Sequence, residues 1–351
     1  MKKVISFILA LVMCVGICCS CVSDEKNTAM SIKGGGKLSV NFMYLLTAFQ
    51  KSMYSQVVNS YENGWNTVID SKTGATFNDF IKEQVIISAE SSLICEYLHD
   101  KVYGLTLTDT QKQSIDNQIA KYTEEAGSKQ KLEEQLSAYS ADIATLKRYF
   151  EISLKQNNIY NLFYDADGIY AIPEDVVKKY FEERYAIVTH IFFNIASKTK
   201  EDGTLVSMTE EERDAKRQTA ESVYSGILAG EDFYALKERL DEDAYGTVYY
   251  PDGFFVTADG SFPAEFTSAA LEMKVGEYRM IETAGNGIHI MHKLPMNAEL
   301  YNSNETVYNS IMSTLITNDF NLKLEEYADR IETNVEQFEL LNPQVVPEYN
   351  L

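Results

Sequence analysis

Apolar and polar positions follow two different periods along the chain. From about residue 39 to 185 apolar residues recur at helical spacing, as in the run from Phe49 to Val57. From residue 186 the spacing becomes that of strands, first in "AIVTHIFFNIA" (186–196) and again in "GIHIMHKLP" (287–295). The pattern therefore predicts a helical region followed by a mixed region.

Capping signals mark where the helices begin. A threonine followed three residues later by glutamine or glutamate predicts a capping box at Thr108–Gln111 and at Thr209–Glu212. Thr76 opens a long apolar-periodic run before the first of these boxes. Pro173 starts another helix at its first turn, where the missing N–H is harmless.

The mixed region, 186–296, predicts an α+β module. Its elements follow the order β-α-α-β-α-β-β, and the last two strands are joined by a turn at "AGNG". This order favours a small antiparallel sheet with helices around it. The expected fold class is therefore α+β, with helical N- and C-terminal regions around an inserted module.

Length and charge narrow the function classes. At 351 residues the chain is expected to contain more than one domain, and 45% hydrophobic residues suffice for real cores. The net charge is −21, from 52 acidic and 31 basic residues. Contact with phosphates needs stripes of Lys and Arg, which do not occur, so nucleic-acid binding is excluded.

The N-terminus predicts export. "MKK" precedes 14 uncharged residues, which are too few for a spanning helix of ~20 residues. The cysteines after this core resemble a bacterial lipoprotein signal, which implies a signal peptide over 1–20 and a tether over 21–38. Cys21 is the expected lipidation site because a small serine precedes it, with Cys18 and Cys19 as alternatives. An ordinary cleaved signal is the other interpretation.

Three further residues are expected to be structural. Cys95 stands in an apolar helical context and is predicted to be a core residue, so no disulfide framework is expected. His99 is expected at the surface or at a helix end. His292 lies three positions after His289 on its strand and should point to the opposite face of the sheet, which argues against a metal pair.

Short motifs at separated positions of the module match one known family. The matching runs are "HIF" (190–192), "LAGEDF" (228–233), "GFF" (253–255), "FPAEF" (262–266), "ALEMKVGE" (270–277) and "GIHIM" (287–291). With these runs the module resembles parvulin-type peptidyl-prolyl cis-trans isomerases. The resemblance implies that the first and last strands are neighbours at the sheet centre.

The same resemblance implies a site. His190 and His289 would face each other across the active cleft, and Asp243 would tune their hydrogen bonds, unless Asp243 is a plain loop carboxylate in the acidic run "DED". No metal and no cofactor are expected. The expected substrate-binding residues, which would grip the proline ring or reach the site, are Phe254, Phe262, Phe266 and Thr283.

The full layout resembles secreted foldase lipoproteins of the PrsA type, with an N-terminal region similar to SurA-type chaperones. The resemblance implies a helical chaperone domain over 39–185 and an isomerase domain over 186–296. Residues 297–351 would form a C-terminal helix and tail that pack on the N-terminal helices. The terminal helices could also pair between chains, as a homodimer.

The implied function is an extracytoplasmic prolyl isomerase and foldase, anchored by lipid to the outer face of the bacterial cell membrane. Its partners would be unfolded or partly folded exported polypeptides with X-Pro bonds. A catalytically inactive chaperone is the alternative, because Phe262 replaces the usual methionine and Ala284 the usual threonine. A hydrolase or solute-binding lipoprotein lacks support, since neither G-x-S-x-G nor a Rossmann fingerprint occurs.

Overall fold

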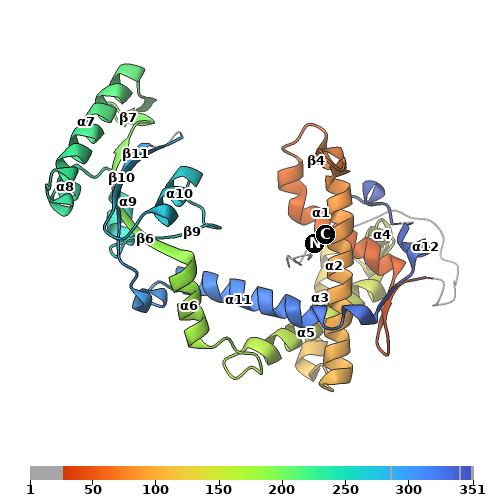
Figure 1. Cartoon of the computed structure of the whole chain (residues 1–351). Coiled ribbons are helices and arrows are strands. Elements are labelled where there is room, and N and C mark those ends of the chain that lie inside the picture. Colours follow the sequence, from red (N-terminus) through yellow and green to blue (C-terminus); the bar gives the residue numbers. More distant parts are fainter. Residues whose placement is uncertain (1–26, 285–286, 340, 349–351) are drawn as a thin grey trace. The chain divides into compact units, whose positions relative to one another are not determined.

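The computed structural model describes residues 27–284, 287–339 and 341–348 and divides into two compact units (Figure 1). Unit 1 comprises 1–171 and 316–351, and unit 2 comprises 172–315, so unit 2 is inserted into unit 1. The predicted signal peptide and Cys21 lie outside the described residues. Among the described helices, none has the length and apolar character needed to cross a membrane.

Unit 1 is built around α2, which packs against both α1 and α5. Its main core joins side chains from three helices, among them Phe49, Leu136 and Leu146. The helices of the N-terminal part are α1 (Val40–Val58), η1 (Gly64–Asn66), α2 (Phe77–Tyr97), η2 (Leu98–Val102), α3 (Asp109–Ala126), α4 (Lys129–Ser137) and α5 (Ile143–Tyr164).

Both ends of the chain contribute to the sheet of unit 1. Its order is β12-β2-β3, with β2 (Thr28–Ile32) antiparallel to β12 (Ile331–Thr333) and to β3 (Lys37–Ser39). The sequence predicts a tether over 21–38 with at most one short strand at its end. β3 lies at that end, but β2 is a second strand in the same stretch, and its Met30 and Ile32 are buried. The smaller elements are β4 (Val68–Asp70), β5 (Ala75–Thr76), η4 (Ala328–Arg330), α12 (Val335–Glu339) and η5 (Pro343–Val345).

Unit 2 contains a four-stranded antiparallel sheet in the order β10-β11-β6-β9. The expectation that the first and last strands are central neighbours is confirmed, because β6 and β11 pair along their length. The elements are α6 (Glu174–Arg184), β6 (Tyr185–Asn194), β7 (Ser197–Thr199), β8 (Leu205–Ser207), α7 (Glu210–Leu228), α8 (Phe233–Leu240), α9 (Ala244–Tyr249), β9 (Phe254–Thr257), α10 (Ala264–Glu272), β10 (Tyr278–Thr283), β11 (Gly287–Lys293) and η3 (Ala298–Tyr301).

Helices cover both faces of this sheet (Figure 1). On one face α10 packs on Val188 and Met291, and on the other α7 and α8 pack on Ile191 and Ile290. Strand alternation explains the split, because even positions of β6 and odd positions of β11 point toward α10. His190 and His289 belong to the α10 face, whereas His292 stacks on Tyr278 on the opposite face, as predicted.

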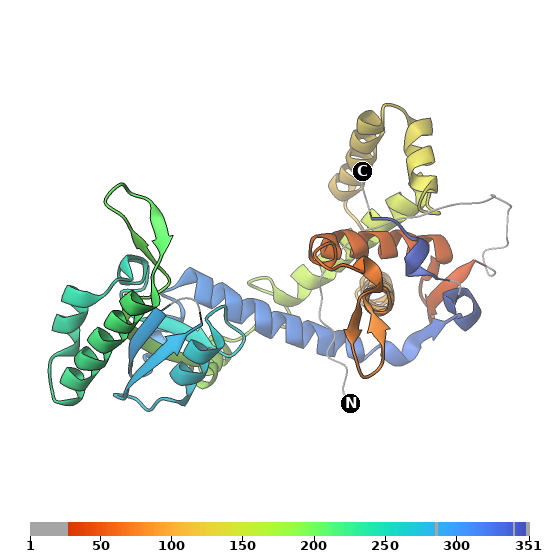
Figure 2. The same cartoon turned by 90° about the horizontal axis from the view of Figure 1, so that it is seen from above.

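Two features differ from the predicted element order. The β7–β8 hairpin, which projects clearly in Figure 2, follows β6 directly and does not emerge from the apolar pattern because Leu205 is exposed. The other is α9, a short helix that Asp243 caps through Gly246 N–H. Both capping boxes, at Thr108 and Thr209, are confirmed.

The boundary between the two units falls within α11 (Glu305–Glu325). In unit 2, Val307 and Ile311 of this helix pack with Phe181 of α6. In unit 1, Phe320 lies against Phe163 and Tyr164. The compact unit 172–315 is thus wider than the module 186–296, whose limits stay a prediction from the motifs.

Candidate active site

Two histidines on the central strands form the middle of the candidate site. The register pairs His190 with Met291 and His289 with Phe192, so the two histidines are diagonal neighbours on one face. Their Nδ1 atoms are 3.2 Å apart, and both side chains are buried. One ring must donate in this contact and the other must accept, so the pair is joined by a hydrogen bond.

Two further polar side chains extend this pair at its ends. Asp243 Oδ2 lies 3.1 Å from His190 Nε2, and Thr283 Oγ1 lies 3.1 Å from His289 Nε2. Thr283 also reaches the carbonyl of Gly287 at 3.3 Å. The structure thus brings together all four polar residues that the sequence predicts, as a row Asp243–His190–His289–Thr283.

The surroundings fix the charges in this row. The hydrogen bond from His190 and the backbone N–H of Gly246 lower the pKa of Asp243 to about 2. Burial, and then the nearby His190, lower the pKa of His289 to about 3. At neutral pH the row therefore holds an ionised Asp243 and a neutral His289.

Three phenylalanines form a wall beside the row. Phe266 is buried, and its ring centroid lies 5.8 Å from that of His190 and 5.2 Å from that of His289. Phe262 is only partly buried and stacks on Phe266 at 5.2 Å. Phe254 contacts His190 at 4.9 Å. The three predicted aromatic residues therefore line the same face as the histidines.

Some residues at the site are not singled out by the sequence patterns. Lys237 Nζ donates to the carbonyl of His190 at 2.6 Å and pairs with Asp241, whose carboxylate accepts from Phe192 N–H at 2.9 Å. Tyr250 packs on Phe254 at 4.9 Å. The i,i+4 spacing of Lys237 and Asp241 is the one available signal, but such pairs are common on exposed helices.

Gly246 is required by the close approach of α9 to Asp243. A Cβ at this position would lie 2.4 Å from Asp243 Oδ2 and 2.6 Å from Phe254 Cζ. We expect Gly246→Ala to push the carboxylate away from His190, so that the pKa of Asp243 rises toward its ordinary value of about 3.9. A carboxyl NMR titration measures this, with exposed Ala244→Gly as the matched control. An unchanged pKa in Gly246→Ala would contradict the assignment.

Acid is expected to destabilise unit 2 through this row. Between about pH 6.5 and pH 3 the unfolded chain protonates His289 and the folded chain does not, so stability falls as the pH decreases. Asp243 adds a further loss below about pH 4, since its folded pKa is depressed. From pH 7 to 5 the His289 contribution is about 2 kcal/mol.

Urea unfolding at both pH values measures this dependence. Between pH 7 and 5 the free energy of unfolding should fall by about 2 kcal/mol less in His289→Gln than in the parent chain, because glutamine does not titrate. Equal pH dependence in the two chains would show that His289 is not held neutral by its surroundings. His292, whose pKa burial also lowers, contributes to both chains alike.

Cys95 and His99 lie outside the site, and both are buried in unit 1. Cys95 is buried, as predicted, and burial raises the pKa of its thiol to about 12. His99 lies at the end of α2, in η2, but it is fully buried and not at the surface. It can be buried because Asp100 and Asn158 bond its two ring nitrogens at 2.6 and 3.2 Å. Among the described residues, no group of His, Cys, Asp or Glu is arranged to hold a metal ion.

No family model matches the chain, and no curated protein matches it. Solved structures that are similar include PrsA from Bacillus subtilis, at 19% identity over 76% of this chain and 91% of that chain, with a TM-score of 0.26. Peptidylprolyl isomerase (PrsA) from Bacillus cereus has 17% identity over 74% of this chain and 89% of that chain, with a TM-score of 0.31. Foldase protein PrsA from Streptococcus pneumoniae has 15% identity over 85% of this chain and 96% of that chain, with a TM-score of 0.27. By these comparisons the chain is similar to foldases of the PrsA type.

Proposed function

We propose that the chain is a peptidyl-prolyl cis-trans isomerase and foldase. The observation that carries this proposal is the row Asp243–His190–His289–Thr283 beside the phenylalanine wall. A prolyl substrate has an apolar ring next to a polar amide, and the site offers an apolar wall next to polar groups. Neither a metal nor a cofactor is needed for this chemistry.

The reaction is a rotation in which no bond forms or breaks. Amide resonance sets a barrier of ~18–20 kcal/mol, so a catalyst must bind the twisted amide better than either planar form. Phe262 and Phe266 would hold the proline ring, with Phe254 behind them. The row would then face the rotating carbonyl, whose charge changes as resonance is lost.

Within the row, the roles follow from charge. The single ring N–H of the neutral His289 and the hydroxyl of Thr283 are already engaged in hydrogen bonds. A substrate carbonyl would therefore take over one of these donors, and it could do so without a net charge on His289 being carried into the apolar pocket. The ionised Asp243 would hold the His190 ring in a fixed orientation. Asp243 is thus proposed as a positioning residue, and the histidines as groups that touch the substrate.

The proposed setting is outside the cell. A chain lipidated at Cys21 would be anchored to the outer face of the bacterial membrane and would act on unfolded or partly folded exported polypeptides with X-Pro bonds.

The N-terminal helical domain and the tail would supply chaperone surfaces, and residues 186–296 would form the isomerase domain. The terminal helices could also pair between two chains as a homodimer. The acidic chain, with a net charge of −21, would be repelled by an anionic membrane surface.

The test is a prolyl exchange assay on the full chain, with short peptides that vary in the residue before proline. We expect acceleration by the parent chain and a loss of at least about tenfold, or about 1.4 kcal/mol of transition-state stabilisation, in a His190→Ala, Asp243→Ala double variant. His292→Ala, on the opposite face of the sheet, is the matched control and should keep the activity.

The second candidate is a chaperone with the same site and no catalysis. The partly buried Phe262, at the position where the family usually has methionine, favours it. A folded parent chain that accelerates no peptide but still suppresses aggregation of an unfolded client would establish this candidate and reject the isomerase.

A further inference from the structure

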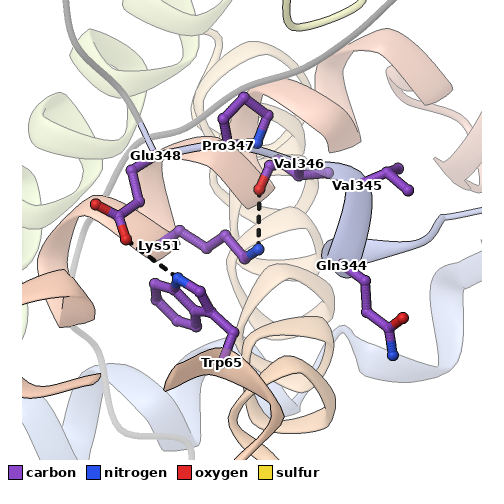
Figure 3. A pocket seen from close by; sticks show the side chains of 7 residues that line it. All are labelled: Lys51, Trp65, Gln344, Val345, Val346, Pro347 and Glu348. Atoms are coloured by element: carbon purple, nitrogen blue, oxygen red, sulfur yellow. Dashed lines mark hydrogen bonds between the residues drawn. The ribbon is translucent and has the colours of Figure 1, made fainter. Parts of the chain in front are cut away.

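Residues 341–348 form a segment on the helical unit, and residues 344–348 of it line a groove together with Lys51 and Trp65 (Figure 3). Lys51 of α1 and Trp65 of η1 form one side, and the segment itself forms the other. Its sequence, "LNPQVVPE", contains two X-Pro bonds. The segment therefore has the chemistry of a short unfolded polypeptide, although it belongs to the same chain.

Only some side chains of the segment anchor it. Leu341, Pro343 and Val346 are buried, and Val346 joins the core cluster around Phe49. The residues between these anchors, among them Val345 at 57% exposure, point outward. Residues Pro343–Val345 form the 3-10 turn η5, so the segment packs on the helical unit as a short turn with three buried anchors.

The strongest polar contact between the groove and the segment is made with the backbone of the segment. Lys51, which is 2% exposed, donates its ammonium to the carbonyl of Val346 at 2.8 Å and lies 4.8 Å above the Trp65 ring. Burial lowers the pKa of Lys51 to about 8. Every peptide has a carbonyl at this point, so the strongest polar contact does not depend on sequence.

The groove has room for more than the segment. A cavity of about 560 Å³ lies between the segment, Lys51 and Trp65. A space of this volume is within the range of small-ligand and peptide pockets, so further residues of a peptide would fit beside the segment.

From these contacts we propose that this groove binds short proline-containing client segments with spaced apolar side chains, and that residues 341–348 are an exchangeable internal occupant. The proposal rests on the proposed function only in that the clients are unfolded polypeptides; it does not involve the histidine row. The tail then keeps an apolar groove covered between clients and competes with each client that arrives.

Trp65 is the single tryptophan of the chain, so its fluorescence reports on the groove directly. Its indole N–H donates to Glu348 at 3.1 Å, a contact that is lost when the tail leaves. We expect a chain that ends at residue 340 to bind the peptide LNPQVVPE with a saturable change in emission. The full chain should bind it at least about tenfold more weakly, because a tethered competitor acts at roughly millimolar effective concentration.

A peptide with Asp in place of the valine at 346 is the matched control and should bind at least about tenfold more weakly, since it would bury a carboxylate. Equal binding of LNPQVVPE to the full and shortened chains, or no binding to a folded shortened chain, overturns the proposal. The His190→Ala, Asp243→Ala variant must give the same emission changes as the parent, so a failure of the isomerase leaves this test intact.

The shortened chain could fail to fold, and hydrogen exchange on the intact protein covers that case. The amide of Val346, bonded to the carbonyl of Pro343, should exchange much faster than the amides within α2, and client peptide should accelerate it further. If Val346 exchanges only together with α2, the segment is a fixed part of the core and the proposal is wrong.

Discussion

Phe266→Ala is expected to lower the free energy of unfolding of unit 2 by about 3–5 kcal/mol. Phe266 is 2% exposed and contacts Phe254, Phe262 and both histidines, so its removal leaves a cavity that these rings cannot all fill. A loss of this size is a large part of the roughly 5–15 kcal/mol that stabilises a typical domain. Urea unfolding followed by circular dichroism measures it.

Phe262→Ala separates packing from substrate binding at the same wall. Phe262 is only partly buried, so its removal should lower the unfolding free energy by roughly 1 kcal/mol, well below the loss from Phe266. Its prolyl activity should nevertheless fall about tenfold or more, because the ring faces the proposed proline pocket. Similar stability losses in the two variants would contradict the assignment of Phe266 to the core and Phe262 to the rim.

Glu96→Gln is expected to destabilise unit 1 by about 3 kcal/mol, or roughly 10 °C in Tm. The Glu96 carboxylate on α2 accepts from Arg148 and, at 2.8 Å, from Lys155, both on α5. Burial opposes the ionised form, but these two cations outweigh it, so the pKa of Glu96 is lowered. Without the Glu96 carboxylate, the positive charges of Arg148 and Lys155 lose the negative charge that they share.

The expected loss lies at the low end for buried ion pairs because the Arg148 side chain is 31% exposed to solvent. Glu124→Gln, an exposed change of the same type on α3, is the matched control and should shift the unfolding free energy by less than about 0.5 kcal/mol. Thermal unfolding at neutral pH compares the two. If Glu96→Gln and Glu124→Gln have the same Tm, this ion pair does not stabilise the packing of α2 on α5.

Local patterns predict much of unit 2 from the sequence. The strands with His190 and His289 follow from their apolar runs, whereas the pairing of these strands is implied by the resemblance to parvulins, because the two histidines are 99 positions apart. The capping box at Thr209 needs only four residues to form. Strand formation and helix capping depend on neighbours in the chain, so a linear pattern contains nearly all the information that determines them.

Features that depend on distant partners are not visible in the same way. A lysine such as Lys51 is expected at the surface, yet it is buried because a carbonyl 295 positions later accepts a hydrogen bond from its ammonium group. His99 is buried because Asn158, on another helix, completes its hydrogen bonds. β2 becomes a strand, where the sequence predicts a tether, by pairing with β12 from the other end of the chain.

The pairing of β2 with β12 has a consequence for the order of folding. β2 can pair with β3 early, but its other edge pairs with residues 331–333, so the sheet of unit 1 is not complete until those residues are available. Unit 2 needs only the continuous stretch 172–315. A chain that emerges from its N-terminus can therefore complete unit 2 first, and slow closure of unit 1 over a long sequence separation follows. Until β12 pairs, the edge of β2 has unpaired backbone N–H and C=O groups, to which a strand of another chain can bind.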